Sequence, residues 1–354
     1  MNPSPKRLHI IFYPPGGLHL TLKDKRVLVT GGAGFIGSHL CRNLVALGAQ
    51  VYVLVKYNSV IDNVRITSIW NKIIPIEADL RNVDSLRQIQ DIKPHIIYHL
   101  AAYNHVGDSF SQVSEAIDSN SKGTVNLLES YEHYKRFVYI STSEVYGRQD
   151  TVPFIETSKP QPLSPYAVGK YSGELYARLK WLSLNKPIVV LRPFNAYGPY
   201  QSPRAITAEL IIKCLKGEDI ITTEGLQTRE FNYVQNLVDG FIAAATVPEA
   251  IGQIINLGCG KEISIRDLVQ TIHSLTNSSS ILKIGELSTR HGEIMRMFCS
   301  NELAKNILSW TPTVEHKPGL LRTIEWYKEY LNNYENPSSG LSQLSLSAEA
   351  TTND

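Results

Sequence analysis

The sequence predicts an α/β fold, a doubly wound parallel sheet with a smaller mixed α/β domain after it. Short runs of Val, Ile and Leu alternate with helical patterns between residues 26 and 192, as in strands that are buried on both faces and joined by helices. A glycine-rich segment follows the first of these runs, where doubly wound sheets have their first tight turn. After residue 195 more turns and mixed elements replace the alternation, so a second domain is expected there.

Each element of the first part is expected for a local reason. The strands are short β-branched and aliphatic runs. They are expected at Arg26–Thr30, Val51–Val55, Ile73–Ile76, Ile96–Leu100, Phe137–Ser141 and Ile188–Arg192. The helices are longer segments in which apolar residues recur every three or four positions. They are expected at Phe35–Leu47, Val83–Ile89, Ala116–His133 and Tyr166–Ser183.

Composition and charge exclude several classes of protein. The chain has 354 residues, is 43% hydrophobic and 19% charged, and its 35 Lys and Arg against 33 Asp and Glu give a net charge of 35 − 33 = +2. It is too apolar and too weakly charged to be disordered throughout. The balance gives no general argument for a nucleic acid or an anionic membrane as partner. No apolar run reaches the roughly 18 residues that a membrane helix requires, so we expect a cytoplasmic protein.

The cysteines carry no sign of a metal or disulfide framework. They are widely spaced and form neither a CxxC pair nor a zinc-type pattern. They are Cys41, Cys214, Cys259 and Cys299. We therefore expect idle thiols in a reducing compartment and no metal site.

The glycine-rich segment TGGAGFIG, residues 30–37, lies directly between the first strand and its helix. Gly31 would allow the tight turn, and Gly37 would let the helix pack closely on the strand. Gly34 would let backbone N–H groups approach a pyrophosphate at the positive end of the helix, where Phe35 and Ile36 follow. A strand before the glycines and a helix after them is the context that makes this a dinucleotide-binding motif. The cofactor is expected to be NAD(P).

The residues after the next strands are expected to hold the adenosine half of the cofactor. The usual fingerprint has an acid after the second strand to bind the ribose hydroxyls, but Lys56 stands beside that place. Lys56 could pair with a 2′-phosphate, which favours NADP over NAD, or could be a solvated loop lysine. Asp79 follows the third strand, next to Leu80, and could accept a hydrogen bond from the adenine amine. The fourth strand ends in residues that would lie against the cofactor, Leu100, Ala101 and Ala102.

A second motif, Tyr166-Ala-Val-Gly-Lys170, points to proton transfer. Helical spacing places residues four apart on one face, and an ammonium beside a phenol lowers the phenol pKa from its usual value of about 10. Tyr166 is therefore a candidate base for a sugar hydroxyl. Thr142, at the end of the fifth strand, could hydrogen-bond the same hydroxyl.

Four motifs in order carry a family resemblance: GGAGFIG at 31–37, TSEVYG at 142–147, YAVGK at 166–170 and RPFNAYGP at 192–199. From about Lys25 to about Tyr330 the chain resembles the extended short-chain dehydrogenases/reductases, in the nucleotide-sugar epimerase/dehydratase group. The resemblance implies a Rossmann-type domain and tightly bound NAD(P). It also implies that Tyr166 is the base, that Lys170 assists it and binds the nicotinamide, and that Thr142 is the third catalytic residue.

The type of reaction depends on the step after oxidation at C4 of the nucleotide-bound hexose. A 4-epimerase turns the keto sugar and returns the hydride, without further acid or base. A 4,6-dehydratase must also remove the C5 proton and expel the C6 hydroxyl, which requires a positioned carboxylate. Glu144 stands where dehydratases of this family have that group. Ser143 replaces the Asp of dTDP-glucose dehydratases, so the proton donor is either Glu144 itself or a water held by Ser143.

Other family patterns also favour the dehydratase. His105 and Ser109, after the fourth strand, resemble the dehydratase pattern, whereas UDP-glucuronate decarboxylases share the Thr-Ser-Glu trio but usually have a Pro/Ser-rich segment there. Val55–Ser59 and Arg192–Ser202 also resemble bacterial dehydratases acting on UDP-N-acetylglucosamine in nonulosonate pathways. We therefore predict a nucleotide-sugar 4,6-dehydratase, with 4-epimerase and then decarboxylase as alternatives. A non-catalytic NADP-binding regulator would not need Thr142, Tyr166 and Lys170.

The resemblance also implies how the second domain holds the substrate, a nucleoside-diphosphate hexose. Guanidinium groups suit phosphate oxygens, and the family segments for that contact contain Arg229, Arg290 and Arg296. Asn195 matches the family asparagine near the diphosphate or sugar. Arg204 lies in a loop that often reaches the sugar nucleotide.

The motifs also suggest a division of the chain. Residues 1–21 would be an N-terminal extension, and the Ser/Thr-rich residues 336–354 a disordered tail. The dinucleotide-binding domain would comprise residues 22–194 and about 231–253. The nucleotide-sugar domain would comprise residues 195–230 and about 254–335. The resemblance also implies a homodimer, in which the two long helices expected at Ala116–His133 and Tyr166–Ser183 pair across the interface.

Overall fold

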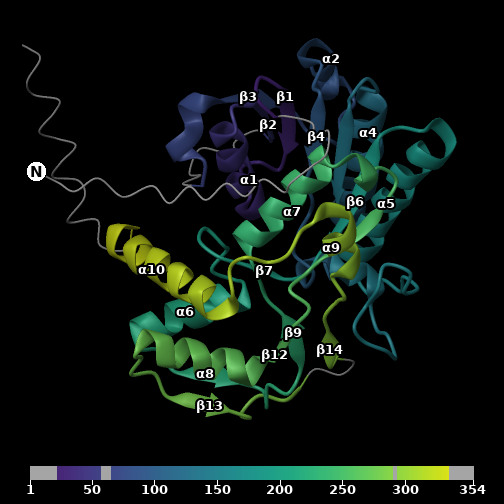
Figure 1. Cartoon of the computed structure of the whole chain (residues 1–354). Helices are drawn as coiled ribbons and strands as arrows, with labels where there is room; N and C mark the ends of the chain where they lie inside the picture. The colour runs from purple at the N-terminus through teal and green to yellow at the C-terminus, as the bar shows by residue number, and fades with distance from the viewer. Residues whose placement is uncertain (1–21, 57–64, 290–292, 335–354) are drawn as a thin grey trace, which may run out of the picture.

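The computed structural model describes residues 22–56, 65–289 and 293–334. Its main feature is a seven-stranded sheet in which every pairing is parallel (Figure 1). In spatial order the strands are β11 (Ile254–Leu257), β6 (Ile188–Pro193), β5 (Arg136–Ile140), β4 (Ile96–His99), β1 (Arg26–Thr30), β2 (Gln50–Val55) and β3 (Ile73–Glu77). The order reverses between β1 and β4, so the predicted doubly wound α/β fold is confirmed.

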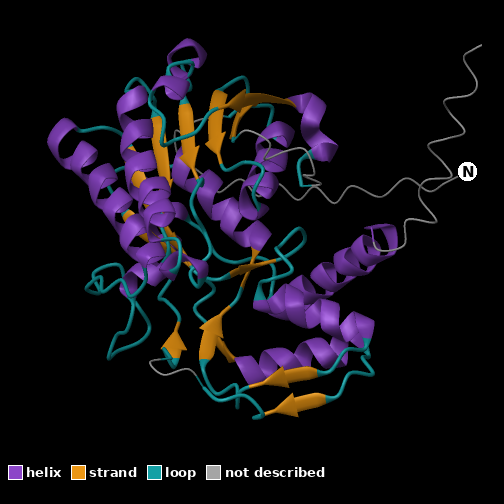
Figure 2. Cartoon of the chain, turned by 180° about the vertical axis from the view of Figure 1, so that it is seen from behind, coloured by secondary structure: helices purple, strands orange, loops and turns teal. Residues whose placement is uncertain are grey.

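Helices cover both faces of this sheet (Figure 2). In every strand of the sheet except β3, alternate residues belong to two hydrophobic clusters, as a period of two requires. Val27 and Val29 pack toward one helical layer, and Leu28 toward the other. The first layer contains α1 (Phe35–Ala46), α7 (Val234–Thr246) and α9 (Glu302–Leu308); the second contains α2 (Ile89–Ile92), α4 (Gly123–Ser130) and α5 (Pro165–Leu184).

The smaller unit lies below the carboxyl edge of the sheet in Figure 1 and contains short strands and helices. Its helices are α6 (Ile206–Lys216), α8 (Ile265–Thr276) and α10 (His316–Tyr334). Its strands are β7 (Ala196–Tyr197), β8 (Ile220–Thr222), β9 (Thr228–Glu230), β10 (Asn232–Tyr233), β12 (Glu262–Ser264), β13 (Leu282–Ile284) and β14 (Arg296–Met297). No helix in the described ranges is long and apolar enough to cross a membrane.

Two of the predicted helices are not continuous α-helices in the structure. The helix expected at Ala116–His133 is a continuous segment made of α3 (Val113–Ile117), a π turn η4 (Asp118–Lys122) and α4, and it ends at Ser130. The amide of Asn120, inside the π turn, accepts from the backbone N–H of Tyr103 at 2.7 Å and donates to its carbonyl at 3.0 Å. These bonds hold the widened turn against the loop after β4, at a position that pattern alone does not reveal.

The helix expected at Val83–Ile89 is replaced by a 3-10 turn, η2 (Asp84–Leu86), followed by the short α2. Polar side chains compete with the helical hydrogen bonds here. The Ser85 hydroxyl donates to the carbonyls of Asp79 and Asn82, and the Asn82 side chain accepts from the backbone N–H of Asp84. The remaining 3-10 segments are η1 (Thr67–Lys72), η3 (Asp108–Phe110), η5 (Ser143–Tyr146) and η6 (Pro248–Ala250).

Strand β11 also differs from the expected division of the chain. The motifs suggest that the second domain resumes at about residue 254, and in the structure Ile254–Leu257 pair with Val190–Pro193 of β6 at the edge of the large sheet. The chain therefore returns to the first unit before α8 begins.

Candidate active site

The glycine segment forms a narrow turn at the start of α1. Gly31 has φ +71°, and a Cβ there would lie 2.7 Å from the backbone nitrogen of Ala101. A Cβ on Gly37 would lie 2.2 Å from the carbonyl oxygen of Gly31. Gly34 is the N-cap of α1, and the first turn contains no acid. The turn thus leaves backbone N–H groups at a positive helix end, a cradle that fits the pyrophosphate of NAD(P).

Thr30 joins this cradle to the end of β4. Its carbonyl accepts from the backbone N–H of Leu100 at 3.2 Å, and its hydroxyl accepts from the N–H of Ala101 at 3.1 Å. The other partner of the hydroxyl is the buried ring of His99, at 2.7 Å. These bonds place Leu100, Ala101 and the following Ala102 beside the glycine turn.

The tyrosine–lysine pair lies on the first turns of α5. The Ser164 hydroxyl caps the helix by accepting from the N–H of Ala167 at 3.1 Å, and Pro165 occupies the first helical position, both of which favour a helix start. Gly169 and Gly173 allow α5 to approach the helix carrying Asn120, since a Cβ at Gly173 would lie 2.7 Å from the Asn120 carbonyl. Sequence and packing therefore fix where Tyr166 and Lys170 stand.

The electrostatics of this pair differ from the sequence expectation. Burial raises the pKa of Tyr166 to about 12, opposed by a hydrogen bond with the Thr142 side chain. The ammonium of Lys170 donates to the carbonyl of Ile140 and lies 4.7 Å above the Tyr139 ring centroid. Burial lowers the pKa of Lys170 to about 7, opposed by the charge of Glu174. The expected lowering of the tyrosine pKa by the lysine is therefore not seen, because burial and the charge of Glu144 raise the pKa of Tyr166 and only the Thr142 hydrogen bond opposes them.

Thr142, Ser143 and Glu144 follow β5 and form the start of η5. The Thr142 hydroxyl accepts from the backbone N–H of Glu144 at 3.2 Å, so it caps the turn. Ser143 is buried. Burial raises the pKa of Glu144, Arg229 opposes this rise, and Glu293 reinforces it. The pKa of Glu144 therefore depends on charges of the second unit, and the charge of Glu144 in turn acts on Tyr166.

A buried ion pair beneath these residues was not predicted from the sequence. Glu174 accepts from the Arg192 guanidinium at 2.5 and 3.1 Å and from the Ser141 hydroxyl at 2.7 Å. The side chains of Glu174 and Arg192 are 0% and 2% exposed. The signal was present, because Glu174 follows Lys170 by four residues and so lies on the same helix face.

The second unit contains a cavity of about 440 Å³, a size typical of a small-molecule site. Its polar lining includes Asn195, Gln227, Arg229 and Glu293. Its apolar lining includes Leu210, Ile220, Phe231, Ile265 and Val269. The Arg229 guanidinium donates to the carbonyls of Thr228 and Ile294 at 2.8 and 2.7 Å and to Glu293 at 2.5 Å.

The other expected substrate residues that the structure describes do not line this cavity. Arg296 does not line it: its guanidinium pairs with Glu262 and is 54% exposed. Arg204 makes a two-pronged contact to Asp108 at 3.0 and 3.1 Å, which links the loop before α6 to η3. Asp108 in turn lies 3.1 Å from His105.

Ser109 and Arg290 are the remaining residues expected at the substrate. Ser109 is buried and donates to the carbonyl of Val106 at 2.6 Å, so its hydroxyl is engaged within its own loop. Arg290 lies outside the described residues.

The comparison with protein families gives a match over most of the chain. The model for the GDP-mannose 4,6 dehydratase family matches residues 28–323. A human dTDP-D-glucose 4,6-dehydratase is 33% identical over 92% of this chain and 95% of its own length. A UDP-N-acetyl-alpha-D-glucosaminuronate decarboxylase of Bacillus cytotoxicus is 35% identical over 87% and 99%. A putative UDP-glucose 4-epimerase of Methanocaldococcus jannaschii is 32% identical over 85% and 98%.

Similar solved structures include epimerases and a dehydratase. The epimerase Mth375 of Methanothermobacter thermautotrophicus aligns with a TM-score of 0.82 and 30% identity, over 88% of this chain and 94% of that protein. The dTDP-glucose 4,6-dehydratase DesIV of Streptomyces venezuelae, solved with NAD bound, aligns with a TM-score of 0.79 and 28% identity over 88% and 99%. The likeness therefore includes dehydratases, epimerases and a decarboxylase.

Proposed function

Because the chain belongs to the GDP-mannose 4,6-dehydratase family, within the extended short-chain dehydrogenases/reductases that act on nucleotide sugars, we propose that it is a nucleotide-sugar 4,6-dehydratase. The product would be a 4-keto-6-deoxy sugar nucleotide. The cofactor would be NAD(P), with its pyrophosphate at the turn of Gly31, Gly34 and Gly37. The single observation that carries the choice of reaction is the position of Glu144.

The position and environment of Glu144 suit a base that removes a proton from a carbon atom beside a ketone. It is adjacent to Thr142 and Ser143 on η5, and its carboxyl group is influenced by Arg229 and Glu293 of the cavity. Burial raises its pKa toward neutrality, which strengthens it as a base and lets it return the proton afterwards. A 4-epimerase has no step that uses such a group.

Tyr166, Thr142 and Lys170 would start the reaction. Tyr166 takes the proton of the C4 hydroxyl, and Thr142 holds that hydroxyl through its own. Lys170 follows Tyr166 by four residues and so lies on the same face of α5. Burial lowers its pKa to about 7, so it would exchange protons with Tyr166 near neutral pH. When bound, NAD(P) supplies the hydride acceptor for C4 and the hydride donor for C6.

Glu144 would then perform the elimination. Its carboxylate takes the C5 proton, which the neighbouring C4 ketone makes acidic, and the C6–oxygen bond breaks. The C6 hydroxyl leaves with a proton from Glu144, or from a water held by Ser143, as one molecule of water. Once C6 is reduced, C5 takes a proton from solvent through Glu144, and Tyr166 releases the proton that it took from the C4 hydroxyl, so the net change is loss of one water.

The second unit would hold the nucleoside diphosphate. Arg229 lines the cavity with a guanidinium fork suited to phosphate oxygens, and Asn195 lines it as well. Arg204 and His105, linked through Asp108, would border the sugar. We propose Arg290 for the same diphosphate contact from the sequence alone.

The test is to incubate the purified protein with UDP-, dTDP-, GDP- and CDP-hexoses and with UDP-glucuronate. We expect a 4-keto-6-deoxy product, detected by its absorbance in alkali and by NMR, from one nucleotide series. Inversion at C4 without that product would establish a 4-epimerase instead. Release of carbon dioxide from the glucuronate would establish a decarboxylase, and no turnover of any sugar would favour a regulator.

Glu144→Gln tests the assigned base directly. We expect loss of water elimination and loss of deuterium exchange at C5, while oxidation at C4 continues and reduced cofactor accumulates. Glu129→Gln, a carboxylate on α4 that is paired with Lys180 at 2.7 Å, is the matched control and should retain activity. Persistent C5 exchange in Glu144→Gln would show that another group is the base.

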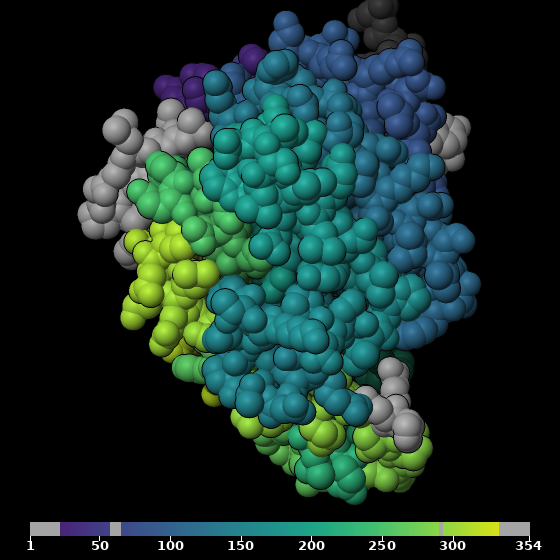
Figure 3. All heavy atoms as spheres, turned by 90° about the vertical axis from the view of Figure 1, so that its right-hand side faces the viewer, coloured from purple at the N-terminus to yellow at the C-terminus, as the bar shows by residue number. Residues whose placement is uncertain are grey.

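We also propose a homodimer formed through α5. Four exposed apolar residues follow one stripe of that helix at intervals of seven, four and three: Val168, Leu175, Leu179 and Leu182. Such a stripe on a solvent-facing helix indicates a contact with another helix. Figure 3 shows this face of the molecule, on which the teal segments lie open at the surface. Sedimentation of the wild type and of Leu179→Glu would test the proposal.

A cytoplasmic location is proposed on the state of the thiols. All four cysteines lie in the described residues and are free, and free buried thiols are typical of a reducing compartment.

A further inference from the structure

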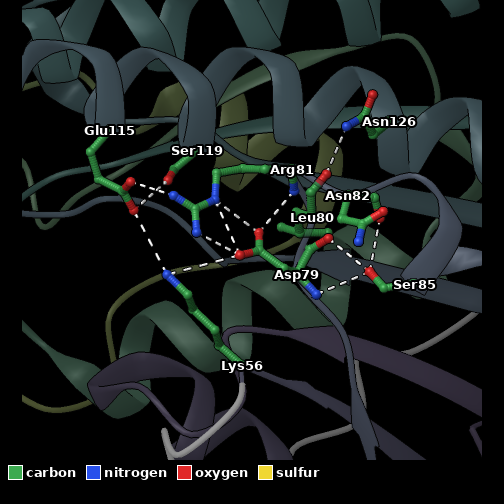
Figure 4. Close-up of polar contacts among 9 residues, drawn as sticks. All are labelled: Lys56, Asp79, Leu80, Arg81, Asn82, Ser85, Glu115, Ser119 and Asn126. Carbon is green, nitrogen blue, oxygen red and sulfur yellow. Dashed lines mark hydrogen bonds and ion pairs between the residues drawn. The ribbon is translucent and has the colours of Figure 1, made fainter.

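A charged network lies beside the glycine turn, where the ends of β2 and β3 meet the helix α3 (Figure 4). Lys56 follows β2, Asp79 and Arg81 follow β3, and Glu115 is on α3. This is the place where a doubly wound fold holds the adenosine ribose. The network therefore bears on whether a 2′-phosphate can be accommodated.

Arg81 is the centre of the network. Asp79 accepts from its backbone N–H at 2.9 Å, from Nε at 3.0 Å and from Nη2 at 2.6 Å. Its remaining terminal nitrogen, Nη1, donates to Glu115. The guanidinium thus bridges two carboxylates from separate elements, and these bonds lower the pKa of Asp79 to about 2.

Lys56 faces the same two carboxylates. Its ammonium lies 4.0 Å from Asp79 and 3.8 Å from Glu115. The two cations and the two carboxylates balance, 2 − 2 = 0, and Asp118 adds a negative charge that also acts on Arg81. A cation at the end of β2 thus has its charge already compensated by acids from two other elements.

We propose that this network makes the chain selective for NAD(H) over NADP(H), with Glu115 as the residue that determines the selectivity. A 2′-phosphate, with a charge near −2 at neutral pH, would approach Asp79 and Glu115 and would have to draw Lys56 or Arg81 away from them. Acids from the β3 end and from α3 thereby replace the one that is missing after β2. This selectivity is the reverse of the preference for NADP that Lys56 alone suggested, and it rests on the proposed cofactor site but not on the reaction.

The experiment measures binding without turnover. Nucleotide-free protein is titrated with NADH and with NADPH by calorimetry, and we expect NADH to bind at least about tenfold tighter. Glu115→Gln should strengthen NADPH binding several-fold and leave NADH binding nearly unchanged. The control is Glu129→Gln, at the far end of the same helical segment, which should change neither affinity.

The outcomes separate this inference from the proposed function. Equal or tighter binding of NADPH by the wild type would overturn it. An equal change in both affinities in Glu115→Gln would overturn the role of that residue, because the effect would not concern the 2′ position. Failure to bind either dinucleotide would instead count against the cofactor site itself.

Discussion

The two walls of the candidate active site hold their charged groups differently. On the catalytic wall, formed by β5, η5, α5 and β6, the Glu174–Arg192 pair is almost fully buried. On the substrate wall, formed by β9, β12 and β14, the Arg296–Glu262 pair is 54% and 22% exposed. The Arg229–Glu293 pair of the same wall is 17% and 21% exposed.

This difference fits the role that the proposed function gives to each wall. The catalytic residues need a fixed geometry, and a buried pair that also bonds Ser141 fixes the junction between α5 and the strands. On the proposed function, the substrate wall would exchange partners when a diphosphate binds, and partly exposed ion pairs exchange at low cost. Substitutions should therefore affect chemistry and stability on the first wall, and affinity on the second.

The largest effect is expected for Tyr166→Phe on the catalytic wall. Loss of the proton-accepting oxygen should lower kcat by about 10²–10⁴-fold, as for other general bases. Tyr176→Phe is the control on the same helix, since that hydroxyl donates only to surface Glu129 among its described partners, and it should retain activity. Measured turnover of Tyr166→Phe within tenfold of the wild type would remove the tyrosine from the mechanism.

The second prediction compares how much the Glu174–Arg192 and Arg296–Glu262 pairs contribute to the free energy of unfolding. Glu174→Gln leaves the Arg192 charge buried and should lower the free energy of unfolding by about 3–5 kcal/mol. Glu262→Gln removes an exposed pair and should cost about 1 kcal/mol or less. Urea unfolding of both variants gives the two values. Similar losses would show that the walls do not differ in the way proposed.

A third effect concerns Lys170 and pH. Its pKa is about 7 in the folded chain, against 10.5 for the ordinary side chain. Between these pH values the unfolded chain binds the proton that the folded chain has lost, so stability should rise with pH, by up to about 1.4 kcal/mol per pH unit. Below pH 7 both states are protonated and the slope from this residue vanishes.

The measurement is the free energy of unfolding of nucleotide-free protein at pH 7 and pH 9. The free energy of unfolding of the wild type should rise between these pH values, and Lys170→Met should lack the part of that rise that comes from Lys170. Lys180→Met is the control on the same helix as Lys170. Lys180 is paired with Glu129 and Glu132, so the variant should keep the rise in stability with pH. The same pH dependence in wild type and Lys170→Met would contradict the lowered pKa.

The contrast between the walls also separates what the sequence could predict from what it could not. Six strands and the helix of Tyr166 arise from local apolar patterns, so their positions agree with the structure within a few residues. The π turn at Asn120 depends on bonds to Tyr103, which is 17 residues away. The placement of β11 depends on pairing with β6, which no local pattern encodes.

The site shows the same division. Tyr166, Lys170 and Thr142 belong to short motifs whose spacing predicts proximity. The partners of the cations were not predictable, because Arg81 meets Glu115 across 34 residues and Arg229 meets Glu293 across 64. Such pairs form only when separate elements approach in the fold, so Lys56 and Arg296 read as free phosphate ligands in the sequence although both face carboxylates in the structure.

The smallest effect is expected on the substrate wall, for Arg229→Lys. A lysine keeps the charge but loses the guanidinium fork, so KM for the nucleotide sugar should rise about tenfold. The value of kcat should stay nearly constant, because the diphosphate contact is the same before and during the reaction. Arg296→Lys is the control on the neighbouring strand, outside the cavity, and should change KM little. A fall in kcat with unchanged KM in Arg229→Lys would place this residue with the chemistry and would break the contrast between the walls.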